Sequence, residues 1–186
     1  TVTTGKASYR LTTASPGGFM IYPMAMAAAI GEALGLTEEE IAAGVAAYTP
    51  TGSRMHIIRL PEGRLLIDDC YNANPQAMTE ALRLLAVTQT RRRAAVLGDM
   101  GELGELTVSA HRAIGALTGE LHLDRVIAIG EKARDIASAA PNAQWFPSVE
   151  DALPAVRAAF TGGTAMLVKA SHAMHFENIV KELEQS

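Results

Sequence analysis

The sequence predicts an α/β fold, Rossmann-like, with a mostly parallel sheet covered by helices on both faces. Short apolar segments alternate about five times with segments of helical period between residues 53 and 186. These short segments are apolar at consecutive positions, as in strands that are buried on both faces. Polar loops follow several of them, at the position where open parallel sheets bind ligands.

The composition is that of a globular protein. The chain has 186 residues, of which 48% are apolar and 19% are charged. Its 16 Lys and Arg against 20 Asp and Glu give a net charge of −4, which argues against nucleic-acid binding. The single cysteine, Cys70, rules out an internal disulfide and fits a reducing compartment. No apolar run reaches the roughly 20 residues of a membrane helix and no signal peptide is visible, so we expect a cytoplasmic protein without a membrane partner.

The first 50 residues predict a small, mainly helical region. Residues 7–13 alternate apolar and polar side chains, as a short strand does. A helix rich in Ala and Met is expected at 23–34, because Pro suits its first turn and Gly follows its end. A second helix is expected from 37 to about 48, because it opens with the capping box Thr-Glu-Glu-Glu. Residues 49–53, Thr-Pro-Thr-Gly-Ser, form the best linker in the sequence.

After the linker, strands and helices alternate. Strands are expected at 65–67, 94–97, 126–129, 144–146 and 165–168. Helices are expected from Asn74 to beyond Leu85, around 106–117, at 131–139, from Asp151 onward, and around 176–183. Asn74 followed by Pro75 is typical of a helix start. Asp151 is expected to cap its helix and to place Pro154 in the first turn, where the missing N–H costs nothing.

Three loops after predicted strands carry most of the chemically useful side chains. They are residues 68–75 (DDCYNANP), 98–104 (GDMGELG) and 169–175 (KASHAMH). Because the carboxyl ends of parallel strands meet at one edge of a sheet, we expect the three loops to line a single cleft.

Simpler interpretations exist for each loop. The paired acids of 68–75 could end a strand while the asparagines make turns and cap a helix. The glycine-rich loop at 98–104 lacks the G-x-G-x-x-G dinucleotide pattern. His172 and His175 have no third soft ligand for zinc, and Ser171 is not in a G-x-S-x-G motif. We therefore expect no metal ligated by these residues and no hydrolase triad.

Two further motifs lack residues that their chemistry would require. Cys70 has no activating base in its local sequence, which weakens it as a nucleophile. Residues 5–7, Gly-Lys-Ala, lack the upstream Gly and the Ser or Thr of a P-loop, and a strand pattern follows them. We predict that this chain contains no P-loop.

The three loops resemble those of the Mur ligase family, in particular its members that add D-alanyl-D-alanine. Residues 68–75 are similar to the family segment D-D-S-Y-N-A-N-P, and residues 96–104 to V-L-G-D-M-x-E-L-G. Residues 167–171 (LVKAS) resemble L-V-K-G-S, and residues 52–55 (GSRM) resemble the G-R-M that joins the central and C-terminal domains. Three motifs in the right order and at the right separations make the resemblance specific.

The chain also departs from the family pattern. Cys70 stands where Ser is usual, and Ala170 where Gly is usual, and both are small enough to preserve the loop paths. The family's N-terminal domain, which holds the uridine nucleotide, is missing. So is most of its central ATPase domain, including the P-loop and the magnesium-binding residues. The sequence starts at Thr1 rather than at Met, so we expect it to begin inside a longer chain.

The resemblance implies a domain division. Residues 1–50 correspond to the C-terminal end of the central ATPase domain, truncated and without a P-loop. Residues 53–186 correspond to the whole C-terminal domain of a Mur ligase.

The resemblance also implies an activity for the parent enzyme, in the cytoplasm of a bacterium. ATP, with Mg²⁺, phosphorylates the terminal carboxylate of UDP-N-acetylmuramoyl-tripeptide, and the amine of D-alanyl-D-alanine attacks the acyl phosphate. This amide ligation makes a peptidoglycan precursor, and the fragment alone is expected to be inactive. The alternatives are another Mur or folylpolyglutamate-type ligase domain, or a non-catalytic Rossmann-like binding module.

Two residues are implied to bind the nucleotide. Arg54 matches the family's ATP-contacting arginine. Asp69 matches the acid that binds the ATP ribose, and a carboxylate is suited to accept hydrogen bonds from hydroxyls.

Five residues are expected to bind the dipeptide, from the family's chemistry together with their position at the strand ends. Asn72, Asn74 and Asp99 would shape the cleft and orient it, and Asp99 could hold or deprotonate its ammonium as a catalytic candidate. Lys169 and Ser171 could bind its carboxylate, the first by charge and the second by its hydroxyl.

Overall fold

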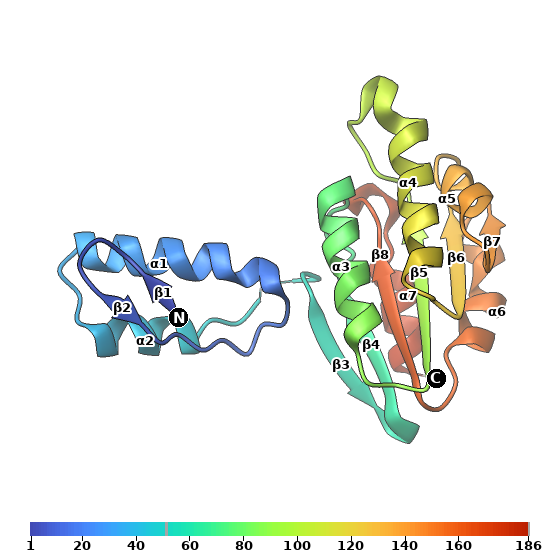
Figure 1. Cartoon of the computed structure of the whole chain (residues 1–186). Helices are drawn as coiled ribbons and strands as arrows, with labels where there is room; N and C mark the ends of the chain where they lie inside the picture. Colours follow the sequence, from blue (N-terminus) through green and yellow to red (C-terminus); the bar gives the residue numbers. More distant parts are fainter. Residues whose placement is uncertain (51, 186) are drawn as a thin grey trace. The chain divides into compact units, whose positions relative to one another are not determined.

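The computed structural model describes residues 1–50 and 52–185, which form two compact units, Thr1–Thr51 and Gly52–Ser186 (Figure 1). Thr51, a member of the predicted linker, lies outside the described residues. The two units have separate apolar cores. No helix in the described part of the chain is long and apolar enough to cross a membrane.

The first unit contains a two-stranded antiparallel sheet and two helices. Its elements are β1 (Val2–Thr3), β2 (Ser8–Tyr9), α1 (Ile21–Ala33) and α2 (Glu38–Ala46). Tyr9, Ala28 and Ile41 form its buried core, one from β2 and one from each helix. The strand expected at 7–13 is confirmed only over Ser8–Tyr9, because just two residues pair with β1.

The predicted start of α2 is confirmed in detail. The Thr37 hydroxyl accepts from the Glu40 N–H at 3.2 Å, and the Glu40 carboxylate accepts from the Thr37 N–H at 2.8 Å. The two bonds satisfy backbone donors that have no partner inside the helix. Gly35 follows α1 with a φ of 78°, a conformation that glycine adopts without strain.

The second unit is built around a six-stranded sheet in the order β3-β4-β8-β5-β6-β7. Its strands are β3 (His56–Leu60), β4 (Arg64–Asp68), β5 (Arg92–Gly98), β6 (Arg125–Ile129), β7 (Ala143–Phe146) and β8 (Thr164–Lys169). Every pair is parallel except β3 with β4. The mostly parallel sheet predicted from the sequence is therefore confirmed.

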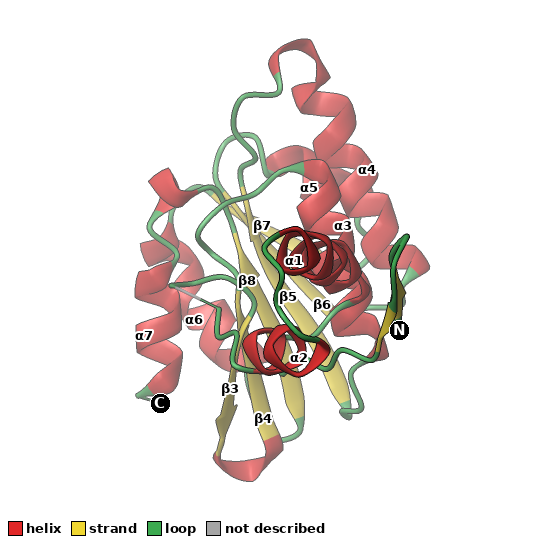
Figure 2. Ribbon diagram, turned by 90° about the vertical axis from the view of Figure 1, so that its left-hand side faces the viewer, coloured by secondary structure: helices red, strands yellow, loops and turns green. Residues whose placement is uncertain are grey.

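Helices cover both faces of this sheet, as predicted (Figure 2). They are α3 (Pro75–Val87), α4 (Thr107–Glu120), α5 (Arg134–Ala139), α6 (Val149–Ala159) and α7 (Glu177–Glu184). The helices α3, α4 and α5 lie on one face, and α6 and α7 lie on the other (Figure 2). Both faces of the central strands are consequently buried, which explains their continuous apolar sequences.

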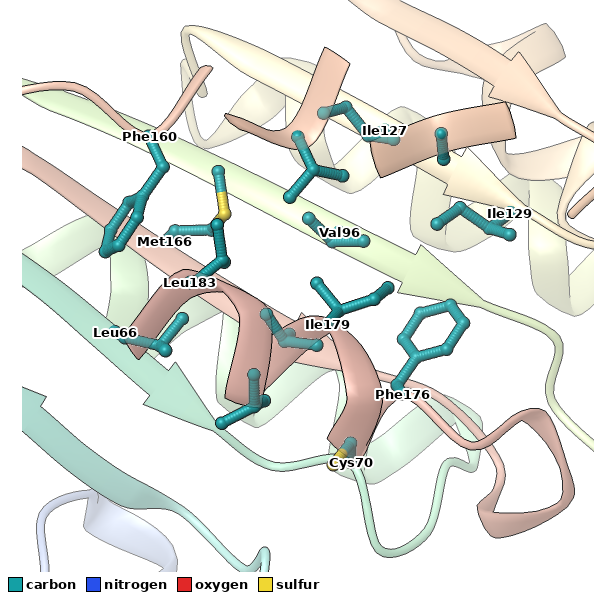
Figure 3. Packing of buried hydrophobic residues seen from close by; sticks show 14 of the residues in the cluster. Leu66, Cys70, Val96, Ile127, Ile129, Phe160, Met166, Phe176, Ile179 and Leu183 are labelled. Carbon is teal, nitrogen blue, oxygen red and sulfur yellow. The ribbon is translucent and has the colours of Figure 1, made fainter. Parts of the chain in front are cut away.

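Apolar packing holds α7 against the sheet (Figure 3). Phe176, Ile179 and Leu183 are fully buried and face side chains of β5 and β8, among them Val96 and Met166. Burying one such side chain contributes about 1.5–3 kcal/mol. Because α7 is the next α-helix after β8, this packing fixes the end of the segment between them, residues 170–176.

Two elements differ from the sequence expectation. The sequence analysis did not identify β3, an edge strand with three half-buried and two exposed residues, whose pattern is weaker than that of a buried strand. The α6 cap is Ser148 rather than Asp151, because the Ser148 hydroxyl accepts from the Asp151 N–H. Pro154 is consequently the sixth residue of α6, inside the helix and beyond its first turn.

Candidate functional site

Three loops meet at one edge of the sheet, and we call them the rim loops. They are residues 69–74 after β4, 99–103 after β5 and 170–176 after β8. The strands β4, β8 and β5 are adjacent and parallel, so their carboxyl ends lie side by side. The Asp69 N–H donates to the Val168 carbonyl at 3.0 Å, and the Ser171 N–H donates to the Asp99 carbonyl at 3.1 Å. The prediction that the loops share one edge is confirmed.

The ammonium of Lys169 is buried beneath the first rim loop. Its Nζ lies 2.5 Å from Oδ2 of Asp69, 2.8 Å from the Asn72 carbonyl and 3.4 Å from the Asp69 carbonyl. The Lys169 side chain is 2% exposed and that of Asp69 13% exposed. An ammonium has three N–H donors, so these oxygens occupy all of them.

The carboxylate of Asp69 joins the Lys169 ammonium to the segment where the chain enters the unit. Its Oδ1 accepts from the Met55 N–H at 2.9 Å. Met55 has a φ of 51°, an unusual value for a residue other than glycine. Burial raises the pKa of the Asp69 carboxyl, and the Lys169 ammonium and the Met55 N–H offset part of that rise.

Arg54, one residue earlier, lies exposed above the aromatic ring of Tyr71. The guanidinium carbon is 4.0 Å from the ring centroid, which is a cation–π contact. The Tyr71 N–H also donates to the Ser53 carbonyl at 3.0 Å. No role for Tyr71 was predicted from the sequence, although an aromatic residue in a polar loop was a usable signal.

Asn72 and Asn74 use their side-chain oxygens locally. Oδ1 of Asn72 accepts from the Ala73 N–H at 2.8 Å, and Oδ1 of Asn74 accepts from the Ala77 N–H at 2.8 Å as the cap of α3. Their side-chain N–H groups have no partner within residues 1–50 and 52–185. Both residues are exposed, so these donors can reach a ligand at the rim.

Ser171 connects the second and third rim loops. Its hydroxyl donates to the Asp99 carbonyl at 2.8 Å and accepts from the Gly101 N–H at 3.0 Å. Oδ1 of the half-buried Asp99 accepts from the Ala133 N–H at 2.7 Å. The Ser171 hydroxyl is thus committed to backbone, whereas Oδ2 of Asp99 has no partner in the part of the chain that the structure describes.

His111 supports the second rim loop from within the core. The fully buried ring accepts from the Met100 N–H at its Nε2, 3.0 Å away. Its Nδ1 lies 2.7 Å from the Thr107 carbonyl and, as this bond requires, carries the proton. His111 was not among the candidates predicted from the sequence. A histidine inside a predicted helix gives no sign that its ring contacts the Met100 N–H of another loop.

The histidines of the third rim loop face solvent. The His172 ring lies 5.3 Å from that of Tyr71, and Nδ1 of His175 lies 3.0 Å from a carboxylate oxygen of Glu177. Among the described residues there is no group of three or more His, Cys, Asp or Glu side chains that could hold a metal ion.

The fold and the rim loops together define a class of protein. It is an α/β domain with a mostly parallel sheet, whose polar loops gather at the edge where such sheets bind ligands. Residues 53–172 match the family described as "Mur ligase, glutamate ligase domain". The chain belongs to this family.

Two curated relatives carry the same name. The UDP-N-acetylmuramoyl-tripeptide–D-alanyl-D-alanine ligase of Bacillus subtilis is 35% identical over 170 residues, which cover 87% of this chain and 37% of that protein. The enzyme of that name from Escherichia coli is 31% identical, with 92% and 38% covered. The chain thus spans less than two-fifths of the length of these relatives.

Solved structures agree with this result. A structure of MurF from Acinetobacter baumannii superposes with a TM-score of 0.85 at 28% identity, covering 95% of this chain and 39% of that one. MurF from Thermotoga maritima in complex with ADP gives 0.79 at 24% identity, with 91% and 39% covered, and supports the fold alone. Folylpolyglutamate synthase from Mycobacterium tuberculosis also shares the fold, with a TM-score of 0.68 at 18% identity.

Proposed function

We propose that this chain is the C-terminal part of an ATP-dependent ligase that adds D-alanyl-D-alanine to UDP-N-acetylmuramoyl-tripeptide in the bacterial cytoplasm. One observation carries the proposal: the loops after β4, β5 and β8 meet at one rim in a chain 35% identical to such a ligase over 87% of its length. Residues 1–50 would be the end of the central ATPase domain, and residues 53–186 the C-terminal domain.

The reaction makes clear what such a domain must do. A phosphorylated carboxylate hydrolyses in water, so the amine must reach it neutral, close and in a shielded site. A C-terminal domain that closes over the central domain meets these needs. The rim is the natural surface to close, because its loops present donors and acceptors at the ends of rigid strands.

At the nucleotide, we assign Arg54 to the phosphates and Asp69 to the ribose hydroxyls. Arg54 is exposed and always charged, as phosphate binding requires. Both Asp69 oxygens already accept a hydrogen bond, but a carboxylate has about four lone-pair sites, so it can still accept from a hydroxyl.

At the dipeptide, we assign Asn72, Asn74 and Asp99. The two asparagines offer side-chain N–H donors, and Oδ2 of Asp99 offers an acceptor for an ammonium. Lys169 and Ser171 were expected to bind the dipeptide carboxylate. Their donors are already engaged within the chain, so their geometry favours support of the loops instead.

ATP enters this proposal as a substrate. Among the described residues, no group of three or more His, Cys, Asp or Glu side chains could hold Mg²⁺ by protein ligands alone. We therefore derive no step through a metal ion on this chain, and the P-loop and magnesium ligands belong to the missing part of the proposed parent.

Phosphate release and product formation test the proposal. The 186-residue chain alone is expected to show no ATP-dependent ligation. Adding the preceding domains of the parent ligase as a separate polypeptide is expected to restore it, with D-alanyl-D-alanine and not glutamate as acceptor. Asp99→Asn in the restored enzyme should lower kcat by about 10²-fold or more. Ligation by the chain alone, or use of glutamate, would contradict the proposal.

A further inference from the structure

We propose that Lys169 is a positioning residue, which holds Arg54 in place through the Asp69 carboxylate and does not contact the substrates. The inference rests on the proposed function, in which Arg54 contacts the nucleotide.

All three N–H donors of the Lys169 ammonium are already engaged within the chain. Its side chain is 2% exposed, and three oxygens, at 2.5, 2.8 and 3.4 Å, surround its Nζ. A dipeptide carboxylate would have to displace one of them and enter a buried space next to the Asp69 carboxylate. Like charges at that distance repel, so the place is unfavourable for an anion.

The contacts of Lys169 lead through Asp69 to the backbone next to Arg54. Two of the three oxygens belong to Asp69 and the third to Asn72, so the ammonium holds the first rim loop. Oδ1 of Asp69 then accepts from the Met55 N–H at 2.9 Å. The ion pair thereby reaches from the last residue of β8 to the backbone next to Arg54.

The segment that carries Arg54 includes a backbone conformation that its surroundings must stabilise. Met55 adopts a φ of 51°, which costs free energy for a residue with a side chain and persists where the surroundings determine it. The first rim loop supplies a second hold, because the Tyr71 N–H donates to the Ser53 carbonyl and the Tyr71 ring lies under Arg54. Both sets of contacts, at Met55 and around Arg54, depend on the first rim loop, which Lys169 fixes.

Loss of the Lys169 ammonium should therefore weaken the hydrogen bond of the Met55 N–H to Asp69. Asp69 would remain a buried carboxylate without its cation, a strongly unfavourable state that the loop relieves by opening toward water. The Met55 N–H would then lose its acceptor and exchange its proton faster. Met55 and Tyr71 report this opening, and the centre of β5 serves as an internal reference.

Amide hydrogen exchange by NMR on the 186-residue chain tests this step. In Lys169→Met, the Met55 amide should exchange about tenfold faster or more, while Val96 in β5 keeps its protection. Lys181→Met, which removes an exposed lysine of α7, should change neither amide. Unchanged Met55 exchange in a folded Lys169→Met protein overturns the inference.

A second variant covers the case in which Lys169→Met fails to fold. Asp69→Asn keeps the size of the side chain but removes its charge, and it should also speed Met55 exchange. Lys169→Arg, which restores a cation, should recover part of the protection that methionine loses. Full protection of Met55 in a folded Asp69→Asn protein would equally overturn the inference.

Steady-state kinetics separate positioning from direct binding. In the ligase restored with its preceding domains, Lys169→Met should raise KM for ATP about tenfold or more and raise KM for D-alanyl-D-alanine less, because Asn72 shares the loop that Lys169 holds. The opposite pattern would make Lys169 a dipeptide ligand and refute the positioning role. A restored wild-type mixture without ligation refutes the proposed function instead, and the amide-exchange result still decides whether Lys169 holds the Arg54 segment.

Discussion

Cys70 belongs to the first rim loop, and its buried thiol donates to the Asp68 carboxylate at 3.0 Å. The residue is 1% exposed. Burial, followed by the hydrogen bond to the negative Asp68, raises the pKa of the Cys70 thiol to about 12. A thiol in this state is a packing residue, because only its thiolate form would be nucleophilic.

This environment predicts that the Cys70 thiol reacts slowly with thiol reagents. At pH 8 the folded chain should react with a disulfide reagent such as DTNB at least about a hundredfold more slowly than the chain unfolded in guanidinium chloride. The release of the coloured thiolate measures both rates. Similar rates in the two states would contradict the burial of Cys70.

Ser171 offers a second prediction for a single side chain. Ser171→Ala leaves the Gly101 N–H without its acceptor and should lower the free energy of unfolding by about 1–2 kcal/mol. The matched control is Ser138→Ala on the exposed side of α5, expected to change stability by less than about 0.5 kcal/mol. Urea unfolding measures both, and equal effects would argue against the Ser171 bridge.

The sequence indicated which residues gather at the rim, but not what most of them bind. The asparagine at the start of α3 could be predicted as a cap, because its partner lies three residues away. The partner of Lys169 lies 100 residues away, and that of Ser171 lies 72 residues away. Such contacts arise from the order of strands in the sheet, which local patterns do not encode.

Among the elements, α4 and α5 depend on one close approach. A Cβ atom added at Gly115 of α4 would lie 2.2 Å from the Ile136 carbonyl oxygen of α5. Real side chains do not tolerate such a distance, and the opposing atom is backbone, which cannot rotate away. Glycine at this position lets the two helices pack side by side.

Gly115→Ala is therefore expected to destabilise the second unit by about 1–3 kcal/mol, because the helices must separate. Tryptophan fluorescence during urea unfolding measures this change. The comparison is Gly44→Ala in α2, where an added Cβ meets no atom within 4 Å. That variant should stabilise the first unit by up to about 1 kcal/mol, since alanine favours helix. Stabilisation by both would show that α4 and α5 do not constrain each other as described.

Element boundaries show where the sequence was informative. The central strands were predictable because each has a continuous apolar run, such as residues 165–168 of β8, a strand whose six residues are all buried. The edge strand β3 was not, because its exposed residues break the apolar run. At α6, two polar residues three positions apart, Ser148 and Asp151, both suit a cap, and only the backbone shows that Ser148 is the cap.

On the scale of the whole molecule, the two units differ in the size of their cores. The first has a buried cluster of three residues, Tyr9, Ala28 and Ile41. The second buries both faces of a six-stranded sheet. Small units bury a smaller fraction of their surface and are less stable for it.

Urea is consequently expected to unfold the chain in two steps, with the first unit unfolding at the lower concentration. The only tryptophan, Trp145, lies in the second unit and reports its unfolding by fluorescence. Far-ultraviolet circular dichroism follows both units. A single transition shared by both probes would contradict independent units.

Acid should affect the first unit through Glu32. Its carboxylate accepts from the Thr4 hydroxyl and, at 2.6 Å, from the Tyr9 hydroxyl, and these bonds lower the pKa of Glu32 below its ordinary value. A lowered pKa in the folded state contributes stability that is present above the ordinary value and lost as pH falls through the folded one. The first transition should therefore move to lower urea below about pH 4.5. Glu32→Gln should remove this shift, and its persistence would assign the acid effect to another group.

The antiparallel direction of β3 has a consequence for how the chain enters its second unit. His56, the first residue of β3, pairs with Asp68, the last residue of β4, so the entry point lies at the same edge as the rim loops. A parallel first strand would have put that entry at the far end of the sheet. A molecule bound at Arg54 would therefore contact the segment through which the chain enters this unit, and by thermodynamic reciprocity any change in that segment that alters its affinity would be altered equally by its binding.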